Sequence, residues 1–222
     1  MNQAPVLAAE ALADQLRSHV LGGGVAPGQR LDEVTLCAHL AVSRNTLREA
    51  FRLLSHEGLV EHRTHRGVFV ATIDAPQARH VYAVRRQLEL GALDELMARR
   101  TSPAQPWSPA EGAALQQMRG QLELAREAQA CDEWMAVGTA NAAFHLVLGS
   151  LGGNPVAERL LAVLVGQTRL RFLALGNPQA IHQGFVDDNE RITLLLEDGQ
   201  VGRARAVLES YLLRAETLLA RD

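Results

Sequence analysis

The chain has 222 residues, of which 47% are hydrophobic, and this is enough apolar material for the cores of one or two globular domains. Its net charge of −3 and its pI near 6.2 argue against a protein that coats nucleic acid nonspecifically, because such a protein needs a broad cationic surface. No stretch has the length and apolarity of a membrane span or a signal peptide, so we expect a cytoplasmic protein with no membrane partner.

The first part of the chain predicts a helix-turn-helix. After a helix over residues 7–21, two short helices are expected within residues 36–54, with a break at Ala41–Val42 and Ser43 as the N-terminal cap of the second helix. The second helix carries apolar residues at spacings of three and four, which must face a core: Leu47, Ala50, Phe51 and Leu54.

The opposite face of this second helix carries side chains suited to nucleic acid. Arg44, Asn45 and Arg48 lie in its first turns, where Arg can bind guanine and Asn can bind adenine in the major groove. Ser43 and Thr46 are better suited to phosphate oxygens. From the helix alone, an ordinary amphipathic helix with a solvated arginine face remains the alternative.

A hairpin is predicted directly after these helices. Gly58 suits the left-handed residue that ends a helix, and apolar runs on either side of residues 64–67 indicate two short strands. The hairpin would place Arg63, His65 and Arg66 at its tip, beside the second helix of the motif. The combination predicts a winged helix-turn-helix domain over residues 1–74.

Residues 75–222 predict an all-α domain of about six helices, which makes the fold mainly α. Interruptions are expected near residues 101–109, 131–132, 152–155, 176–178 and 198–199. Cys37 and Cys131 are too few for a disulfide framework or a zinc site, and we expect both to be reduced core residues.

Several polar side chains of this second domain fall on helix faces that should be buried. Asn141 and His145 are four residues apart and therefore share one face, and Asn189 follows Phe185 by four residues. Tyr211 lies among apolar residues of the last helix. Burying such groups without partners costs about 1–3 kcal/mol each, so we expect them to meet one another, water or a ligand.

These motifs resemble two parts of one bacterial family. The first domain is similar to the DNA-binding domain of GntR-family transcription regulators through residues 28–31, 40–50, 57–60 and 66–70. The second is similar to the ligand-binding domain of the FadR-type (FCD) branch through residues 84–89, 141–145, 153–155 and 192–199. The resemblance implies a homodimeric regulator, usually a repressor, that binds a pseudo-palindromic double-stranded DNA operator and responds to a small organic acid.

The resemblance also implies site residues. The operator contacts fall on Ser43, Arg44, Asn45, Thr46, Arg48, Arg66 and Gly67. The effector-binding positions fall on Arg85, Asn141, His145, Asn189 and Tyr211. Arg169 and Arg171 are further candidates for binding an anion, but they are two residues apart on a helix and face different directions. His182 lies off the matched positions, and we expect it on the surface.

A metal site is the feature in which this chain departs from the family. Much of the branch uses an Asp and three His to bind a divalent metal, which in turn binds a carboxylate effector. The corresponding residues here are Asn141, His145, Asn189 and Tyr211, so His145 is the one good metal ligand left. We predict no tightly bound metal and no other cofactor, with a retained divalent metal as the less favoured alternative.

Two other functions are weighed against a DNA-binding regulator. An enzyme could use His145 with nearby carboxylates, but the sequence has no nucleophile triad, phosphate-binding glycine loop or metal-ligand set. A winged helix used only for contact with another protein would not need the base-reading side chains Arg44, Asn45 and Arg48. The sequence therefore predicts a DNA-binding regulator that is not an enzyme.

Overall fold

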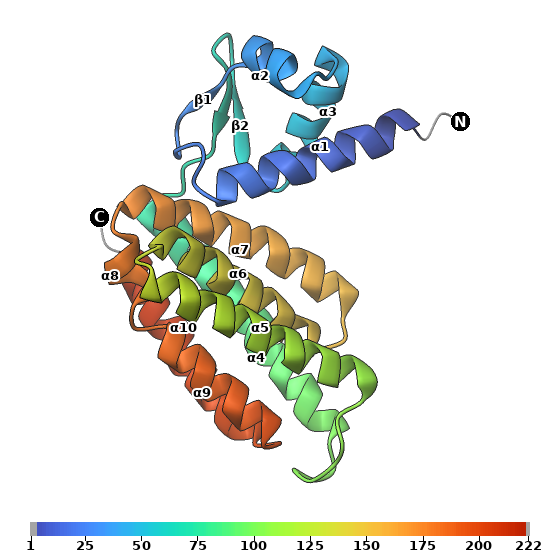
Figure 1. Cartoon of the computed structure of the whole chain (residues 1–222), viewed down its shortest axis with the longest axis vertical. Helices are drawn as coiled ribbons and strands as arrows, with labels where there is room; N and C mark the ends of the chain where they lie inside the picture. The colour runs from blue at the N-terminus through green and yellow to red at the C-terminus, as the bar shows by residue number, and fades with distance from the viewer. Residues whose placement is uncertain (1–3, 221–222) are drawn as a thin grey trace. The chain divides into compact units, whose positions relative to one another are not determined.

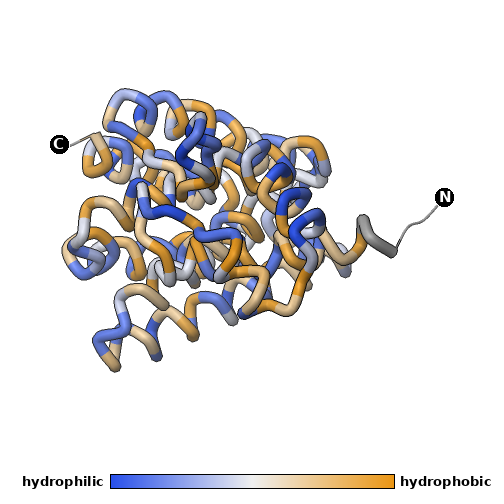
Figure 2. Tube along the Cα trace, turned by 90° about the horizontal axis from the view of Figure 1, so that it is seen from above, coloured by the Kyte–Doolittle hydropathy of each residue, from blue (hydrophilic) through white to orange (hydrophobic). Residues whose placement is uncertain are grey.

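The computed structural model describes residues 4–220. They divide into two compact units, and the boundary in the chain lies between Ile73 and Asp74. Both units are drawn in Figure 1. In Figure 2, hydrophobic and hydrophilic residues alternate along the helical traces, as amphipathic helices around a core require. Among the described helices, none combines the length and apolarity needed to cross a bilayer.

The first unit contains the predicted pair of short helices. Its described elements are α1 (Ala4–Leu21), β1 (Arg30–Leu31), α2 (Glu33–Leu40), α3 (Arg44–His56), β2 (Val60–Arg63) and β3 (Gly67–Val70). The turn between α2 and α3 passes through Ala41, whose φ of 52° is left-handed. Ser43 then caps α3, because its Oγ accepts the backbone N–H of Thr46 at 3.1 Å.

The apolar stripe of α3 is buried, as predicted. Leu47, Ala50, Phe51 and Leu54 are all 0% exposed. Helix α3 packs against α1, whose buried residues include Leu12, Leu16 and Val20. Because one side of α3 is held in this core, its other side is presented to solvent in a fixed orientation.

The predicted hairpin is confirmed, and a third strand joins it. Strands β2 and β3 pair antiparallel, with Val60 opposite Val70 and Arg63 opposite Gly67. The two-residue strand β1 pairs with the other edge of β3, so the sheet order is β1-β3-β2. Strand β1 has no signature in the sequence, because two residues are too few to show an alternating pattern.

The described secondary-structure elements of the second unit are all helices. Its elements are α4 (Ala75–Arg99), α5 (Pro109–Ala130), α6 (Trp134–Ser150), α7 (Pro155–Leu175), α8 (Pro178–His182), α9 (Val186–Glu197) and α10 (Val201–Leu219). All five predicted interruptions are confirmed. The described part contains seven helices rather than about six, because a break at residues 183–185 separates the short helix α8 from α9.

The long helices of this unit lie side by side as a bundle (Figure 1). Helix α4 contacts α6, α7 and α10, while α5 packs on α6 and α9. Four helices begin with a polar cap residue and have one proline at their first or second position. The cap side chain accepts a free backbone N–H, and the proline fixes a helical φ. These caps are Asp74, Ser108, Asn154 and Asn177.

The expectation for the two cysteines is wrong for Cys131 and only partly met for Cys37. Cys37 is half-buried in α2, whereas Cys131 is exposed. Cys131 is the residue that follows α5, and Asp132 next to it has a left-handed φ of 59°. The tight turn between α5 and α6 therefore turns Cys131 outward.

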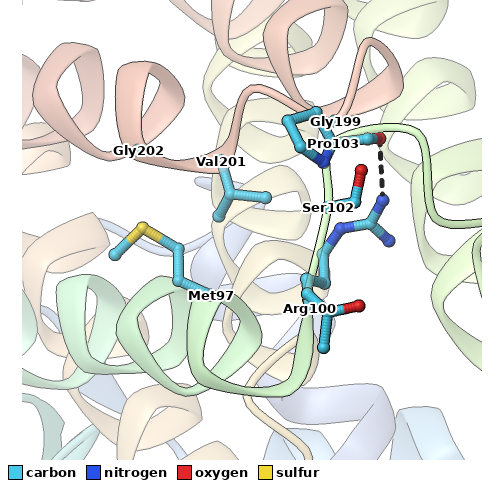
Figure 3. A pocket seen from close by; sticks show the side chains of 8 residues that line it. Met97, Arg100, Ser102, Pro103, Gly199, Val201 and Gly202 are labelled. Carbon is cyan, nitrogen blue, oxygen red and sulfur yellow. Dashed lines mark hydrogen bonds between the residues drawn. The ribbon is translucent and has the colours of Figure 1, made fainter.

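A close backbone approach fixes one end of the helical unit. Gly199, in the turn between α9 and α10, has a φ of +71°, and a Cβ added to it would lie 2.1 Å from the carbonyl oxygen of Pro103. Figure 3 shows Pro103 and Gly199 side by side at a surface pocket that Met97 and Val201 also line. The Arg100 guanidinium donates to the same Pro103 oxygen at 3.1 Å.

We expect Gly199→Ala to destabilise the fold by at least about 1–2 kcal/mol, because the left-handed backbone and the Pro103 carbonyl both exclude a Cβ. Chemical denaturation of the full chain measures the change. Gly120→Ala is the matched control. Gly120 lies inside α5 with open space around it, so alanine there should stabilise the chain by about 0.5–1 kcal/mol. Equal stability of the two variants would contradict this account.

Candidate functional site

The N-terminus of α3 presents a polar surface to solvent. Arg44 and Asn45 are exposed in the first turn, and Thr46 is half-buried. The Ser43 Oγ is engaged in the helix cap and also lies 2.8 Å from the Thr46 Oγ1. Arg48 is exposed and donates from Nε to the Glu33 carboxylate at a long 3.4 Å. Arg44 and Asn45 are thus the side chains best placed to contact a ligand at this surface.

The hairpin between β2 and β3 forms the second part of this surface. Arg66 is exposed at the tip, and Gly67 has a φ of +98° that L residues rarely adopt. Arg63 does not lie at the tip as predicted. It is the last residue of β2, where its guanidinium stacks on the Phe69 ring at 4.2 Å and donates to Glu61 at 2.8 Å.

Arg30 is a basic residue of this surface that is not predicted from the sequence. It is exposed on β1, and its Nε lies 3.4 Å from where a Cβ of Gly67 would be. The pairing of β1 with β3 is what brings Arg30 to the hairpin. The two-residue strand is too short for a recognisable periodicity, so the sequence carries no signal for this placement of Arg30.

The helical unit brings three of the predicted polar residues together. Asn141 of α6 accepts two hydrogen bonds at its Oδ1, from Asn189 Nδ2 at 2.7 Å and from the Tyr211 hydroxyl at 3.0 Å. All three residues are at least nine-tenths buried. Burial also raises the pKa of the Tyr211 hydroxyl well above its usual value, so the phenol stays protonated and acts as a donor.

A buried ion-pair network lies beside this cluster. Arg85 and Glu89 of α4 are 3% and 0% exposed, and Arg85 Nε donates to Glu89 Oε1 at 2.9 Å. Glu89 Oε2 lies 2.6 Å from His145 Nδ1, and Arg85 Nη1 donates to the Thr168 Oγ1 at 2.9 Å. Burial alone would raise the pKa of the Glu89 carboxyl, but Arg85 and then His145 hold it below its usual range.

A small cavity adjoins both groups. Residues of α4, α6, α7 and α8 line it, including Arg85, Asn141, His145, Thr168, Arg169 and His182. Its volume of about 10 Å³ is close to the space that one water molecule needs. Arg85, Asn141 and His145, predicted from the sequence to bind an effector, thus share one cavity wall, whereas Asn189 and Tyr211 support it through Asn141.

His182 is buried, which corrects its expected position on the surface. It is 1% exposed, and its Nε2 lies 3.2 Å from Nη1 of Arg169, which is 3% exposed. Arg169 also donates to the backbone carbonyl of Met135 at 2.7 Å. Arg171 is only half-buried and donates to the carbonyl of Leu219, so the two arginines do face different directions.

We expect His182 to make the fold less stable in acid. Burial, and then the charge of Arg169, lowers the pKa of His182 to about 3 from the ordinary value of 6.5. Between these values the unfolded chain binds a proton that the folded chain does not. The free energy of unfolding should therefore fall as the pH drops below 6.5, by about 2 kcal/mol at pH 5. Urea unfolding between pH 5 and 6.5 measures this change. The free energy of unfolding of His182→Gln should depend less on pH than that of the wild type, and an equal pH dependence of the two chains would contradict the role of His182.

The residues at the four positions implied for a metal do not fit a divalent cation. The Asn141 Oδ1 is occupied by two donors, and the Tyr211 phenol is held protonated by burial. Asn189 donates through its nitrogen to Asn141, which leaves His145 as one good ligand. Among the described residues, no three His, Cys, Asp or Glu side chains are grouped so that they could hold a metal ion.

Comparison with known proteins covers both units. Residues 8–70 match the bacterial regulatory proteins of the gntR family, and residues 80–214 match the FCD domain. An HTH-type transcriptional regulator from an unstable DNA locus of Streptomyces ambofaciens is 32% identical over 199 residues, which are 89% of this chain and 79% of that protein.

Solved structures give the same assignment. A GntR transcriptional regulator from Rhodococcus sp. RHA1 is 32% identical, with a TM-score of 0.84 over 95% of this chain and 96% of that one. McbR/YncC from E. coli shares the fold at 18% identity, with a TM-score of 0.77 over 96% of each chain. The predicted family and fold class are confirmed: the chain belongs to the gntR family of bacterial regulatory proteins, in the branch with an FCD domain, and is a DNA-binding transcription regulator.

Proposed function

We propose that this regulator is a cytoplasmic homodimer that represses transcription from a pseudo-palindromic operator and responds to a small organic acid. Residues 1–74 would form the DNA-binding domain, and residues 75–222 the domain for dimerisation and effector binding. Two copies related by a two-fold axis can read two half-sites of opposite orientation. The proposal has no enzymatic step, because the Thr168 hydroxyl that lines the cavity is hydrogen-bonded to Arg85 and to the Val165 carbonyl rather than to a base that could activate it.

One observation carries the DNA-binding part. Arg44 and Asn45 are exposed in the first turn of α3, while the opposite side of the same helix is fully buried. A helix held in this way can enter the major groove with its base-reading side chains in a fixed register. The proposed contacts are Ser43, Arg44, Asn45, Thr46 and Arg48 on α3, with Arg66 and Gly67 of the hairpin and Arg30 beside it.

The cavity of the helical unit supports the effector part. Arg85, Asn141 and His145 line it directly, and Asn189 and Tyr211 hold Asn141 from behind. The Nε2 of His145 is buried without a hydrogen-bond partner, so it can bind a ligand. The effector is proposed to bind these residues without a metal, and its differential affinity for two dimer arrangements would couple the cavity to DNA binding.

The test is the selection of binding sites by the purified full chain from random double-stranded DNA. We expect an inverted repeat with half-sites about one helical turn apart, or a multiple of it, bound by two copies of the chain. Light scattering of the complex gives the stoichiometry. Footprinting of the selected site on the genome then shows whether it overlaps a promoter, as a repressor requires. Enrichment of no sequence, or binding of one copy to an unrepeated site, would contradict the proposal.

A further inference from the structure

A groove on the surface of the helical unit lies between its last two helices. Helices α9 and α10 pack side by side (Figure 1), and the groove between them has a volume of about 330 Å³. Sites for small molecules have volumes of about 300–1,000 Å³. We propose that this groove binds a phosphorylated small molecule through Arg191, Arg203 and Arg214. The site is separate from the buried cavity and does not depend on the organic acid proposed there.

The groove carries more positive than negative charge. Three arginines and one carboxylate, Asp188, line it, which leaves a net charge of +2 in a chain whose net charge is −3. Arg214 forms an ion pair with Asp188. Arg203 donates to the neutral amide oxygen of Gln200, and Arg191 interacts with Asp188 through its charge alone. Among the described residues, no carboxylate oxygen lies within 4 Å of Arg191 or Arg203.

The other acidic side chains of these two helices do not supply the missing negative charge. Asp187 and Glu190 of α9 bind Arg126 of α5, at 2.7 and 2.6 Å. Arg205 of α10 shows the contrast with the groove, because it donates to both carboxylate oxygens of Asp94, at 2.6 and 3.2 Å. The arginines outside the groove thus meet carboxylates of neighbouring helices. An anion from solution is the corresponding partner for the arginines within it.

Three donors gather at one end of the groove. A short turn joins α9 to α10, so the two helices run antiparallel, and the ion pair between Asp188 and Arg214 sets their register. Arg191 and Ser210 each lie about one helical turn from this ion pair, on facing helices. The Ser210 Oγ accepts from Arg214 at 3.2 Å and can donate its own proton to a ligand.

The rest of the groove suits the body of a ligand. Leu195 and Val207 line its middle. Arg203 lies seven residues before Ser210, which is about 10 Å along the helix axis. A ligand with an anionic group at the Arg191 end can therefore place an apolar or planar body on Leu195 and Val207, and Arg203 adds its charge at the far end.

The anionic group that fits best is a phosphoryl group. A phosphate monoester carries a charge of about −1.5 to −2 at pH 7 and three acceptor oxygens. This matches the net charge of +2 and the three donor side chains Arg191, Ser210 and Arg214. A carboxylate has one negative charge and two oxygens, so it would leave part of the groove charge without a partner.

The experiment compares phenyl phosphate with benzoate, which has the same ring and a carboxylate in place of the phosphate. Calorimetry with the full chain gives the affinity, and the arginine Nε–H signals in NMR spectra report binding at the groove. We expect phenyl phosphate to shift the signals of Arg191 and Arg214. Benzoate should bind at the groove at least about fivefold more weakly, because it has less charge and one oxygen fewer.

Variants of the groove should change this affinity in opposite directions. Arg191→Gln should weaken phenyl phosphate binding about tenfold, and Arg203→Gln, farther from the phosphoryl group, about two- to fivefold. Asp188→Asn removes the carboxylate that competes for Arg214, so it should strengthen binding by about two- to fivefold. Arg159→Gln is the matched control. It removes an exposed arginine of α7 outside the groove and should bind phenyl phosphate as the wild type does.

Three results would overturn the inference. They are a wild type that does not bind phenyl phosphate, equal binding of benzoate at the groove, and an Arg191→Gln chain with the affinity of Arg159→Gln. A short DNA duplex without the operator tests the other source of phosphate. If Arg191→Gln weakened binding of this duplex while phenyl phosphate did not bind, the groove would contact the nucleic-acid backbone and the proposed small-molecule site would be wrong.

Discussion

Replacing Glu89 with alanine is expected to lower the free energy of unfolding by about 3–5 kcal/mol, because it leaves two buried partners without their acceptor. Glu89 is 0% exposed and accepts from Arg85 through Oε1 and from His145 through Oε2. The charge of Arg85 would then remain buried among neutral groups such as the Thr168 and Tyr82 hydroxyls. Urea denaturation at neutral pH measures the loss.

Three further variants test this explanation. Glu95→Ala, at an exposed position of α4, should change stability by less than about 0.5 kcal/mol. Glu89→Gln should lie between wild type and Glu89→Ala, because the amide oxygen can still accept from Arg85. The double variant Arg85→Met/Glu89→Leu should lose much less than Glu89→Ala, since no charge stays buried alone. A Glu89→Ala chain as stable as Glu95→Ala would show that the buried network contributes little.

Replacing Arg44 with alanine is expected to weaken operator binding by about 1–3 kcal/mol, or about 5- to 150-fold, if Arg44 donates two hydrogen bonds to a base. Arg44 is exposed in the first turn of α3, on the side opposite the buried stripe. A base contact also carries sequence information. The variant should therefore lose discrimination at one position of each half-site, and a binding assay with single-base operator variants measures this.

Arg52→Ala is the control on the same helix. Arg52 is exposed about two turns after the start of α3 and is paired with Glu49 at 2.9 Å. Its guanidinium could at most contact a DNA phosphate. The substitution should therefore weaken binding to all DNA sequences equally, and it should reduce the slope of log affinity against log salt concentration by about one. An Arg44→Ala variant with unchanged operator affinity would instead favour a winged helix used for contact with another protein.

The features that the sequence predicts well are those with a short repeat in the chain. The stripe of Leu47, Ala50, Phe51 and Leu54 has helical spacing, and the cap at Ser43 precedes it directly. The same reasoning placed the five interruptions in the helical unit, because glycine, proline and cap residues act on their immediate neighbours. Patterns of neighbouring residues do not predict β1, because its two residues form a strand only through their pairing with β3.

The site in the helical unit was only partly predictable. Asn141, His145, Asn189 and Tyr211 could be identified as polar residues on faces that should be buried, and their burial follows from helical spacing. Their hydrogen bonds could not be predicted, since Asn141 and Tyr211 are 70 residues apart in the chain. The donor to each oxygen depends on how three helices pack.

By itself, the sequence determined the two-domain organisation, the family and the polar side of the recognition helix, because these depend on local spacing and on motifs within a few turns. Tertiary structure alone decided which side chains the buried arginines contact. Arg85 and Arg169 look alike in the sequence, but the first meets Glu89 and the second meets His182. His182 itself follows a glycine–asparagine–proline turn typical of the surface, and it is buried because α8 folds back onto α6 and α7. Burial and charge pairing depend on residues far apart in the chain, and only the packed helices bring them together.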